Sequence, residues 1–184
     1  MITQSLLRER QAWTAEQLSQ AGIHVTPQEL GRIEVADFGL DDIDHFGIQL
    51  LTYINTARVC AKEIVMRPGQ ICPEHRHPDV QGLPGKEETF RCRAGSIQLY
   101  VPSDNSSASR PSSTLSEADL NVLTSRQEIN LTPGDQYTVF PDTLHWFRAG
   151  AEGAIVSEFS TRSTDEADVF TDARISRIPT VSDE

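Results

Sequence analysis

The most restrictive feature of this sequence is a series of short β-rich segments that begins at about residue 46. Turn-forming residues separate these segments, among them Pro68-Gly69, Ala94-Gly95 and Pro133-Gly134. The segments are 47–55, 59–66, 96–102, 127–131, 136–140 and 154–160. Many short strands with regular turns are typical of β-sandwiches and β-barrels. The sequence therefore predicts an all-β core over most of the chain.

A helical pattern precedes the strands. Residues 2–22 carry apolar side chains at a loose helical spacing, and Gly22 is suited to end that helix. Thr26-Pro27-Gln28-Glu29 has the form of a capping box with proline at the first helical position, which predicts a second short helix. We expect residues 1–45 to form a helical segment that packs on a barrel of residues 46–184, within one domain overall.

Two later segments contain fewer strand signals. Residues 103–116 are serine-rich and nearly free of large apolar side chains, which predicts a surface loop between two strands. The acidic tail from Ser163 onward contains Phe170 and Ile175, so we expect this C-terminal extension to pack partly on the barrel.

Charge and cysteine content exclude several classes of protein. The net charge is −11, which would repel nucleic acid and an anionic membrane surface. The longest apolar runs are too short to span a bilayer. Three cysteines without a CxxC pair indicate reduced, partly buried thiols rather than a disulfide framework. We therefore expect a cytoplasmic protein that binds neither nucleic acid nor a membrane.

Two half-motifs carry the candidate chemistry. His75 and His77 are two residues apart, which places both imidazoles on one face of a strand and makes a common half-site for a transition metal. The first half-motif has the form G-x5-H-x-H…E-x6-G and runs from Gly69 to Gly95, with Glu88 as its acid. The second begins at Pro133-Gly134 and ends at His145. Each half consists of a strand, a turn and a strand, and ends on a potential ligand.

These half-motifs resemble the two signature motifs of the cupin superfamily over roughly residues 58–160. The resemblance implies a double-stranded β-helix, or jelly-roll, barrel with short N-terminal helices. It also implies a metal in the barrel mouth held by His75, His77, Glu88 and His145. The sequence departs from the usual pattern, because ten residues separate His77 from Glu88 where cupins have three or four, and Asp142 replaces the usual glycine. Three imidazoles and one carboxylate suit Mn, Fe(II), Co, Ni or Zn.

Several other titratable residues lie near the motifs and are weighed as candidate ligands or catalytic groups. Glu74 and Glu87 could offer a carboxylate, but Glu74 is out of phase with the two histidines and Glu87 with Glu88, so Glu88 is favoured. His24 and His45 are interpreted as surface or capping residues. Lys86 shares the phase of Glu88 and should point into the barrel. It either bends out to water, or acts as a proton carrier or clamps a substrate oxygen.

A closer resemblance selects among these interpretations. The runs GKEETFRCRAGSIQLYVP, LTPGDQYTVFPDTLHWFRAG and VSEFSTRSTDEADVFTDARISRI are similar to the D-lyxose isomerase family of manganese-dependent cupins. That family has a K-x-E motif with a catalytic lysine and a ligating glutamate, which Lys86-x-Glu88 matches. The resemblance implies a Mn²⁺-dependent isomerase, expected to be a homodimer by analogy, although the PDVQGLPG loop is longer than in the shorter family members.

This resemblance implies interconversion of D-lyxose and D-xylulose, with D-mannose and D-fructose as a second pair, through a cis-enediol. Such a reaction needs a Lewis acid and two proton carriers. Lys86 is the first carrier, and Glu158 and Asp172 are equal candidates for the second. Two alternatives stay open: an Fe(II) cupin dioxygenase with the same four ligands, and a non-catalytic sugar-binding cupin.

Overall fold

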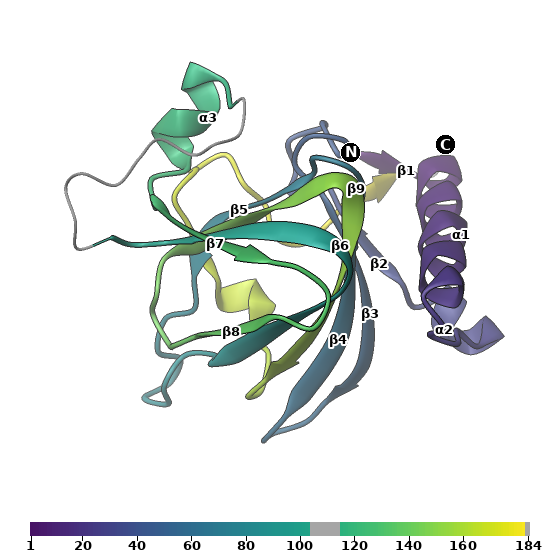
Figure 1. Ribbon diagram of the computed structural model, residues 1–184, viewed down its shortest axis with the longest axis horizontal. Coiled ribbons are helices and arrows are strands. Elements are labelled where there is room, and N and C mark those ends of the chain that lie inside the picture. Colours follow the sequence, from purple (N-terminus) through teal and green to yellow (C-terminus); the bar gives the residue numbers. More distant parts are fainter. Residues whose placement is uncertain (104–114, 183–184) are drawn as a thin grey trace.

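A curled antiparallel sheet of nine strands dominates the computed structural model, which describes residues 1–103 and 115–182 (Figure 1). The strands are β2 (Glu34–Ala36), β3 (Ile48–Asn55), β4 (Cys60–Met66), β5 (Ile71–Arg76), β6 (Glu88–Val101), β7 (Gln127–Leu131), β8 (Gln136–Val139), β9 (His145–Ser160) and β10 (Val169–Phe170). Their order is β10-β5-β9-β4-β3-β2, and β6 pairs with β7, β8 and β9. The sheet curls around an apolar core, so the predicted all-β barrel is confirmed.

The two long strands β6 and β9 let the barrel close. They pair along most of their length, with register shifts between Cys92 and Ala94 and between Gly95 and Ile97. Gly95 has a φ of +67°, and a Cβ atom there would lie 2.0 Å from the carbonyl oxygen of Gly153. Only glycine tolerates both the backbone conformation and this close approach. β9 also pairs with β4 and β5, which joins the two halves of the sheet.

The N-terminal residues lie outside the barrel. Helix α1 (Gln4–Gln20) packs against β2, β3 and β4, and α2 (Pro27–Leu30) follows it (Figure 1). The capping box at Thr26 is confirmed. The first helix begins two residues later than predicted, because Ile2–Thr3 forms β1 and pairs with β11 (Val181–Ser182). The division into a helical segment and a barrel within one domain stays a prediction.

Two segments near the barrel mouth differ from simple loops. Residues 104–114 of the serine-rich stretch lie outside the described residues, but Ser116 caps a short helix, α3 (Glu117–Val122). The acidic tail packs on the barrel as expected, through the 3₁₀ turn η1 (Asp165–Ala167) and β10, in which Phe170 pairs with His75. We call residues 161–172 the C-terminal strap.

The cysteines at 60, 72 and 92 are buried free thiols, as predicted.

No helix in the described part of the chain is long and apolar enough to cross a membrane.

Candidate functional site

The structure brings together the four residues expected to hold a metal. His75 lies near the end of β5 and His77 just after it, while Glu88 and His145 begin β6 and β9. One ligand atom from each of the four lies within 4.8 Å of the others, and all four side chains are buried. Pairing of His75 with His145 across β5 and β9 places two of these imidazoles side by side. The alternation predicted from the sequence therefore gathers these groups on the inner face of the barrel.

The long interval between His77 and Glu88 does not separate the cluster. Within it, Val80 and Leu83 exchange two backbone hydrogen bonds of 3.0 Å each. Gln81 and Gly82 have φ values of +54° and +79°, the pattern of a two-residue hairpin turn. The extra residues thus form a small hairpin that begins and ends beside the cluster. Asp142, which replaces the usual glycine, adopts the left-handed conformation with a φ of +59°.

Partners outside the cluster fix the orientation of each imidazole. His75 Nδ1 lies 2.8 Å from the carbonyl oxygen of Pro73, and His145 Nδ1 lies 2.9 Å from that of Thr143. Because a carbonyl only accepts, both Nδ1 atoms donate, and a neutral ring then presents the lone pair of Nε2 to the cluster. His77 Nδ1 contacts Asp168 Oδ1 at 2.6 Å. This is the arrangement in which histidines usually bind metals.

The centre of the cluster fits a cation. His145 Nε2 is buried and makes no hydrogen bond, although it lies 2.9 Å from Glu88 Oε1. A lone pair on this nitrogen and a carboxylate oxygen repel each other unless a positive charge lies near both. Burial, followed by the neighbouring histidines 145 and 77, lowers the pKa of His75 well below its usual value. The donor set and this unpaired nitrogen therefore fit a divalent transition metal.

His77 carries the positive charge in this cluster. Burial, the largest single effect, lowers the pKa of His77, but the charge of Glu88 and the hydrogen bonds to Asp168 and Glu88 together raise it to about 9. The ring lies between Asp168 and Glu88, with His77 Nε2 2.9 Å from Glu88 Oε1. A metal bound by this nitrogen would displace its proton.

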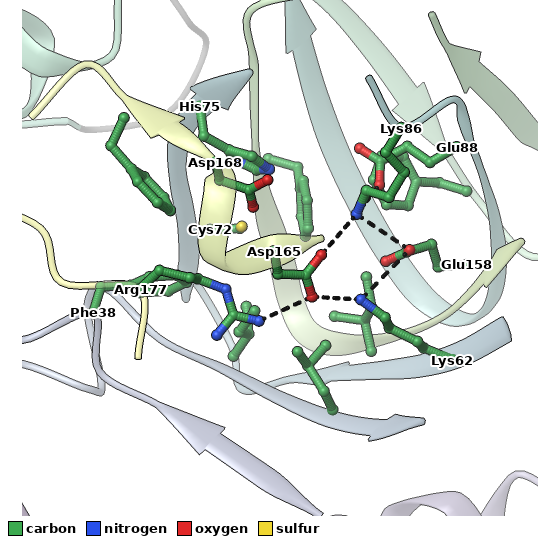
Figure 2. A pocket seen from close by; sticks show the side chains of 16 residues that line it. Phe38, Lys62, Cys72, His75, Lys86, Glu88, Glu158, Asp165, Asp168 and Arg177 are labelled. Atoms are coloured by element: carbon green, nitrogen blue, oxygen red, sulfur yellow. Dashed lines mark hydrogen bonds and ion pairs between the residues drawn. The ribbon is translucent and has the colours of Figure 1, made fainter. Parts of the chain in front are cut away.

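Lys86 points into the barrel rather than out to water. Its ammonium nitrogen lies 2.8 Å from Glu88 Oε2 and 3.3 Å from both Glu158 Oε1 and Asp165 Oδ1 (Figure 2). Burial opposes the ammonium charge, but these carboxylates raise the pKa of Lys86 well above its usual value. Lys86 is therefore a cationic hydrogen-bond donor at neutral pH. A lysine beside a metal site is electrostatically costly alone, and the carboxylates offset that cost.

The two carboxylates considered as second proton carriers lie in different places. Glu158, on β9, lines the cavity beside Lys86, and Ser160 donates to its Oε1 at 3.1 Å. Asp172 is not among the residues that line this cavity. Its carboxylate is paired with Arg174, 2.6 Å away, which lowers the pKa of Asp172.

Four charged residues of the site were missed by sequence reasoning. Lys62 on β4 contacts Asp165 Oδ2 at 2.6 Å and Ser163 Oγ at 2.9 Å. Arg177 also reaches Asp165 Oδ2, at 3.2 Å (Figure 2). Its guanidinium group pairs with Glu34 as well. The missed residues are Lys62, Asp165, Asp168 and Arg177. Three of them come from the acidic tail, so the C-terminal strap and the residues just after it complete one side of the site.

The cavity between these charges and the cluster has apolar walls. They include Ile64, Phe90, Phe147 and Phe170. Phe170 also packs on His75, with ring centroids 5.4 Å apart. Trp146 stacks instead on Tyr100 in the core. The cavity thus combines a candidate metal centre with two ammonium groups, three further carboxylates and apolar walls.

The other acids and histidines have structural partners. Glu74 accepts hydrogen bonds from Thr124, Ser125 and Thr171, and so ties the strap to the loop after α3. Glu87 is exposed. His24 is also exposed, and His45 contacts Asp119 Oδ1 at 3.1 Å.

Comparisons with known proteins point to sugar isomerases. The sequence profile of the D-lyxose isomerase family matches residues 5–184. The D-lyxose/D-mannose isomerase of Thermosediminibacter oceani is 54% identical over 183 residues, covering 100% of both chains. The D-lyxose ketol-isomerase of Cohnella laeviribosi is 53% identical, covering 95% of this chain and 94% of that protein. L-ribose isomerase of Acinetobacter sp. DL28, in complex with L-ribose, superposes with a TM-score of 0.81 at 17% identity, covering 98% of each chain.

A jelly-roll barrel whose mouth gathers three histidines and a glutamate defines a cupin with a candidate metal centre. Within that class, the profile match and the close relatives show that this chain belongs to the D-lyxose isomerase family. It is therefore a sugar isomerase, and the family resemblance drawn from the sequence is confirmed.

Proposed function

We propose that this protein interconverts D-lyxose and D-xylulose, with D-mannose and D-fructose as a second pair, through a cis-enediol. The substrates come from the names of the relatives, which are a D-lyxose/D-mannose isomerase and D-lyxose ketol-isomerases. One structural observation carries the proposal: the Lys86 ammonium lies between Glu88 and Glu158, 2.8 and 3.3 Å away. A proton donor and a carboxylate thus adjoin one cluster of candidate metal ligands.

We propose that His75, His77, Glu88 and His145 hold a divalent metal, with Mn²⁺ favoured over Zn, Fe, Co and Ni. When bound, such a metal polarises the sugar carbonyl and stabilises the negative charge that develops on the enediol oxygens. Support comes from the unpaired, buried Nε2 of His145 and from the outer partners that orient the histidines. Manganese rests on the family resemblance, because the ligand set itself suits several metals.

The chain's own groups divide the proton transfers. Glu158, as a carboxylate, takes the proton from C2 of the open-chain aldose and returns it to C1, while the hydroxyl proton moves from O2 to O1. Lys86 carries this second proton: its ammonium group gives a proton to O1 as charge develops there and takes up the proton of O2, so it is cationic before and after the reaction. The apolar walls at Phe90 and Phe147 keep water from the enediol.

Glu158 and Asp172 can be compared as a matched pair. Glu158→Gln should lower kcat by about 10²–10⁴-fold, because the amide cannot accept the C2 proton. Asp172→Asn should stay within about threefold of the wild type in kcat, because its partner is Arg174 outside the cavity. Steady-state rates with D-lyxose, together with metal content, check both values. The reverse order of effects would assign the base to Asp172.

The overall function is tested with a panel of aldoses and ketoses. After chelation, the protein is reloaded with each candidate metal separately, and sugar products and oxygen uptake are measured. We expect D-lyxose to give D-xylulose fastest with Mn²⁺, with D-mannose converted more slowly, and no oxygen uptake. Oxygen uptake without isomerisation would indicate the dioxygenase, and saturable sugar binding without turnover would indicate the binding protein.

We further propose that the enzyme is a cytoplasmic homodimer. The location is supported by the three free, buried thiols, which suit a reducing compartment. The dimer is expected by analogy with the family, and a mass measurement in solution by light scattering would contradict it if the chain were a monomer.

A further inference from the structure

A groove lies beside the reaction cavity, on the outer side of the C-terminal strap. Glu34, Thr52 and Asn55, from β2 and β3, form one wall. Ser163 from the strap and Ile178 from the following segment form the other. The groove volume is about 370 Å³. Sites for small molecules usually measure about 300–1,000 Å³, so the groove is large enough for a monosaccharide.

The groove and the reaction cavity share a partition of charged side chains. Lys62, Asp165 and Arg177 line both spaces. Asp165 is the centre of the partition, because it accepts from the other two and also contacts Lys86 (Figure 2). The reaction cavity has a volume of only about 30 Å³. Such a space holds about one or two water molecules, so part of its lining must move before a sugar fits, and the partition is the part of that lining that also borders the groove.

The partition is held by polar contacts between side chains. It consists of side-chain hydrogen bonds and ion pairs between Lys62, Asp165 and Arg177. The strap beside it is fixed independently by Asn55, whose amide bonds the backbone of Ser163 at 3.0 and 3.1 Å. Sugar hydroxyls both donate and accept, so they can replace the bonds of Lys62 and Asp165 as these side chains separate.

The charges of the groove favour a neutral ligand. Arg177 is already paired with Glu34 and Asp165, and Lys62 with Asp165. Glu166 adds a further carboxylate to the lining. An anionic ligand would meet neutralised cations and a surplus carboxylate, in a chain of net charge −11. A polyol meets alternating donors and acceptors instead, with Ile178 and Pro179 available to its C–H faces.

We propose that this groove is a first binding site for a neutral sugar, which reaches the reaction cavity when the Lys62–Asp165–Arg177 partition opens. This inference rests on the proposed function and adds a second sugar site and a route of access. In this proposal, the groove binds the sugar first, and both proton transfers take place in the reaction cavity.

Two neighbouring tryptophan substitutions test the groove. Thr52 pairs with Lys62 across β3 and β4 and lines the groove, whereas Tyr53 is exposed and does not line it. Thr52→Trp should fill the groove and lower kcat/KM for D-lyxose by at least about tenfold, mainly through a higher KM. Tyr53→Trp should match the wild type, and both variants should keep their metal. Equal kcat/KM values for the two variants would overturn the proposal.

Two further measurements separate this inference from the proposed function. If Thr52→Trp unfolds or loses metal, Ile178→Trp replaces it, because Ile178 lies on the opposite wall and is 61% exposed; unchanged kcat/KM in that variant also overturns the proposal. If the wild type converts no sugar, the proposed function fails, and calorimetric titration with D-arabinitol tests the groove alone. Weaker binding by Thr52→Trp than by Tyr53→Trp supports it, and equal binding rejects it.

The neutral character of the ligand is tested with a phosphate ester. D-mannose 6-phosphate should be converted at least about tenfold less efficiently than D-mannose, because the cations of the groove are already paired. Preference for the phosphate ester would show that Arg177 or Lys62 receives an anion, and would overturn the assignment of a neutral ligand.

Discussion

Replacing Lys86 with methionine should abolish nearly all isomerisation while the protein still binds its metal. We expect kcat for D-lyxose to fall by about 10²–10⁴-fold, the usual contribution of a positioned acid or base. The substitution keeps most of the volume of the side chain but removes the ammonium group that contacts Glu88 and Glu158. Steady-state kinetics and metal analysis on the same preparation check both parts of this expectation.

Loss of a buried positive charge also affects stability, so the Lys86 experiment needs a charge-preserving control. Breaking a buried ion pair commonly costs about 3–5 kcal/mol. Asp165 keeps Lys62 and Arg177 as partners, which should allow the variant to fold. Lys86→Arg keeps the charge but changes its position and geometry, and should stay poorly active. Near-wild-type turnover in Lys86→Arg would reduce the role of Lys86 to charge compensation, and near-wild-type turnover in Lys86→Met would exclude any catalytic role.

The cluster of four candidate ligands was predicted from the resemblance to the cupin motifs, and the local phase of the side chains supported that prediction. His75 and His77 share a strand face, as do Lys86 and Glu88, and side-chain alternation is fixed by backbone geometry. Side-chain alternation also predicted that Glu74 points away from the two histidines. In the structure, its carboxylate accepts hydrogen bonds from Thr124 and Ser125. The long interval after His77 does not move Glu88 away from the histidines, because its extra residues form a separate hairpin.

Lys62 was missed although a signal was present in its strand. Cys60, Lys62, Ile64 and Met66 alternate along β4 and are all buried, so the lysine occupies an inward position in an apolar series. A lysine is rarely buried without a partner, and its phase alone could have suggested a carboxylate in the barrel. The identity of that partner was out of reach, because Asp165 lies on the strap and meets Lys62 only through the tertiary fold.

The strap itself shows a second limit. Its acidic composition is typical of a solvated surface segment, and only Phe170 and Ile175 indicated that it packs on the barrel. Each acid becomes distinctive only through its partner: Asp165 meets two lysines and an arginine, and Asp168 meets His77. These contacts depend on how the last part of the chain returns to the barrel mouth, which no periodic pattern encodes. Glu158 and Asp172 were therefore equal candidates in the sequence.

Replacing Glu88 with glutamine should separate metal binding from folding. The substitution preserves shape but removes the only carboxylate of the cluster, so metal affinity should fall at least about a hundredfold, the upper range for losing even an outer partner of a ligand. Lys86 keeps Glu158 and Asp165 as partners, and the barrel should remain folded. Metal titration after chelation measures the affinity directly, and Glu87→Gln, at the exposed neighbouring position, is the matched control.

Thermal unfolding gives a readout of the same Glu88 variant that does not depend on activity. A metal that binds only the folded protein stabilises it by about 2.7 kcal/mol at a hundred times its dissociation constant. Added Mn²⁺ should therefore raise the Tm of the chelated wild type and of Glu87→Gln by several degrees, but leave Glu88→Gln nearly unchanged at that concentration. A full rise in Glu88→Gln, with wild-type stoichiometry, would exclude Glu88 as a ligand. The three histidines would then have to hold the metal with a different oxygen donor.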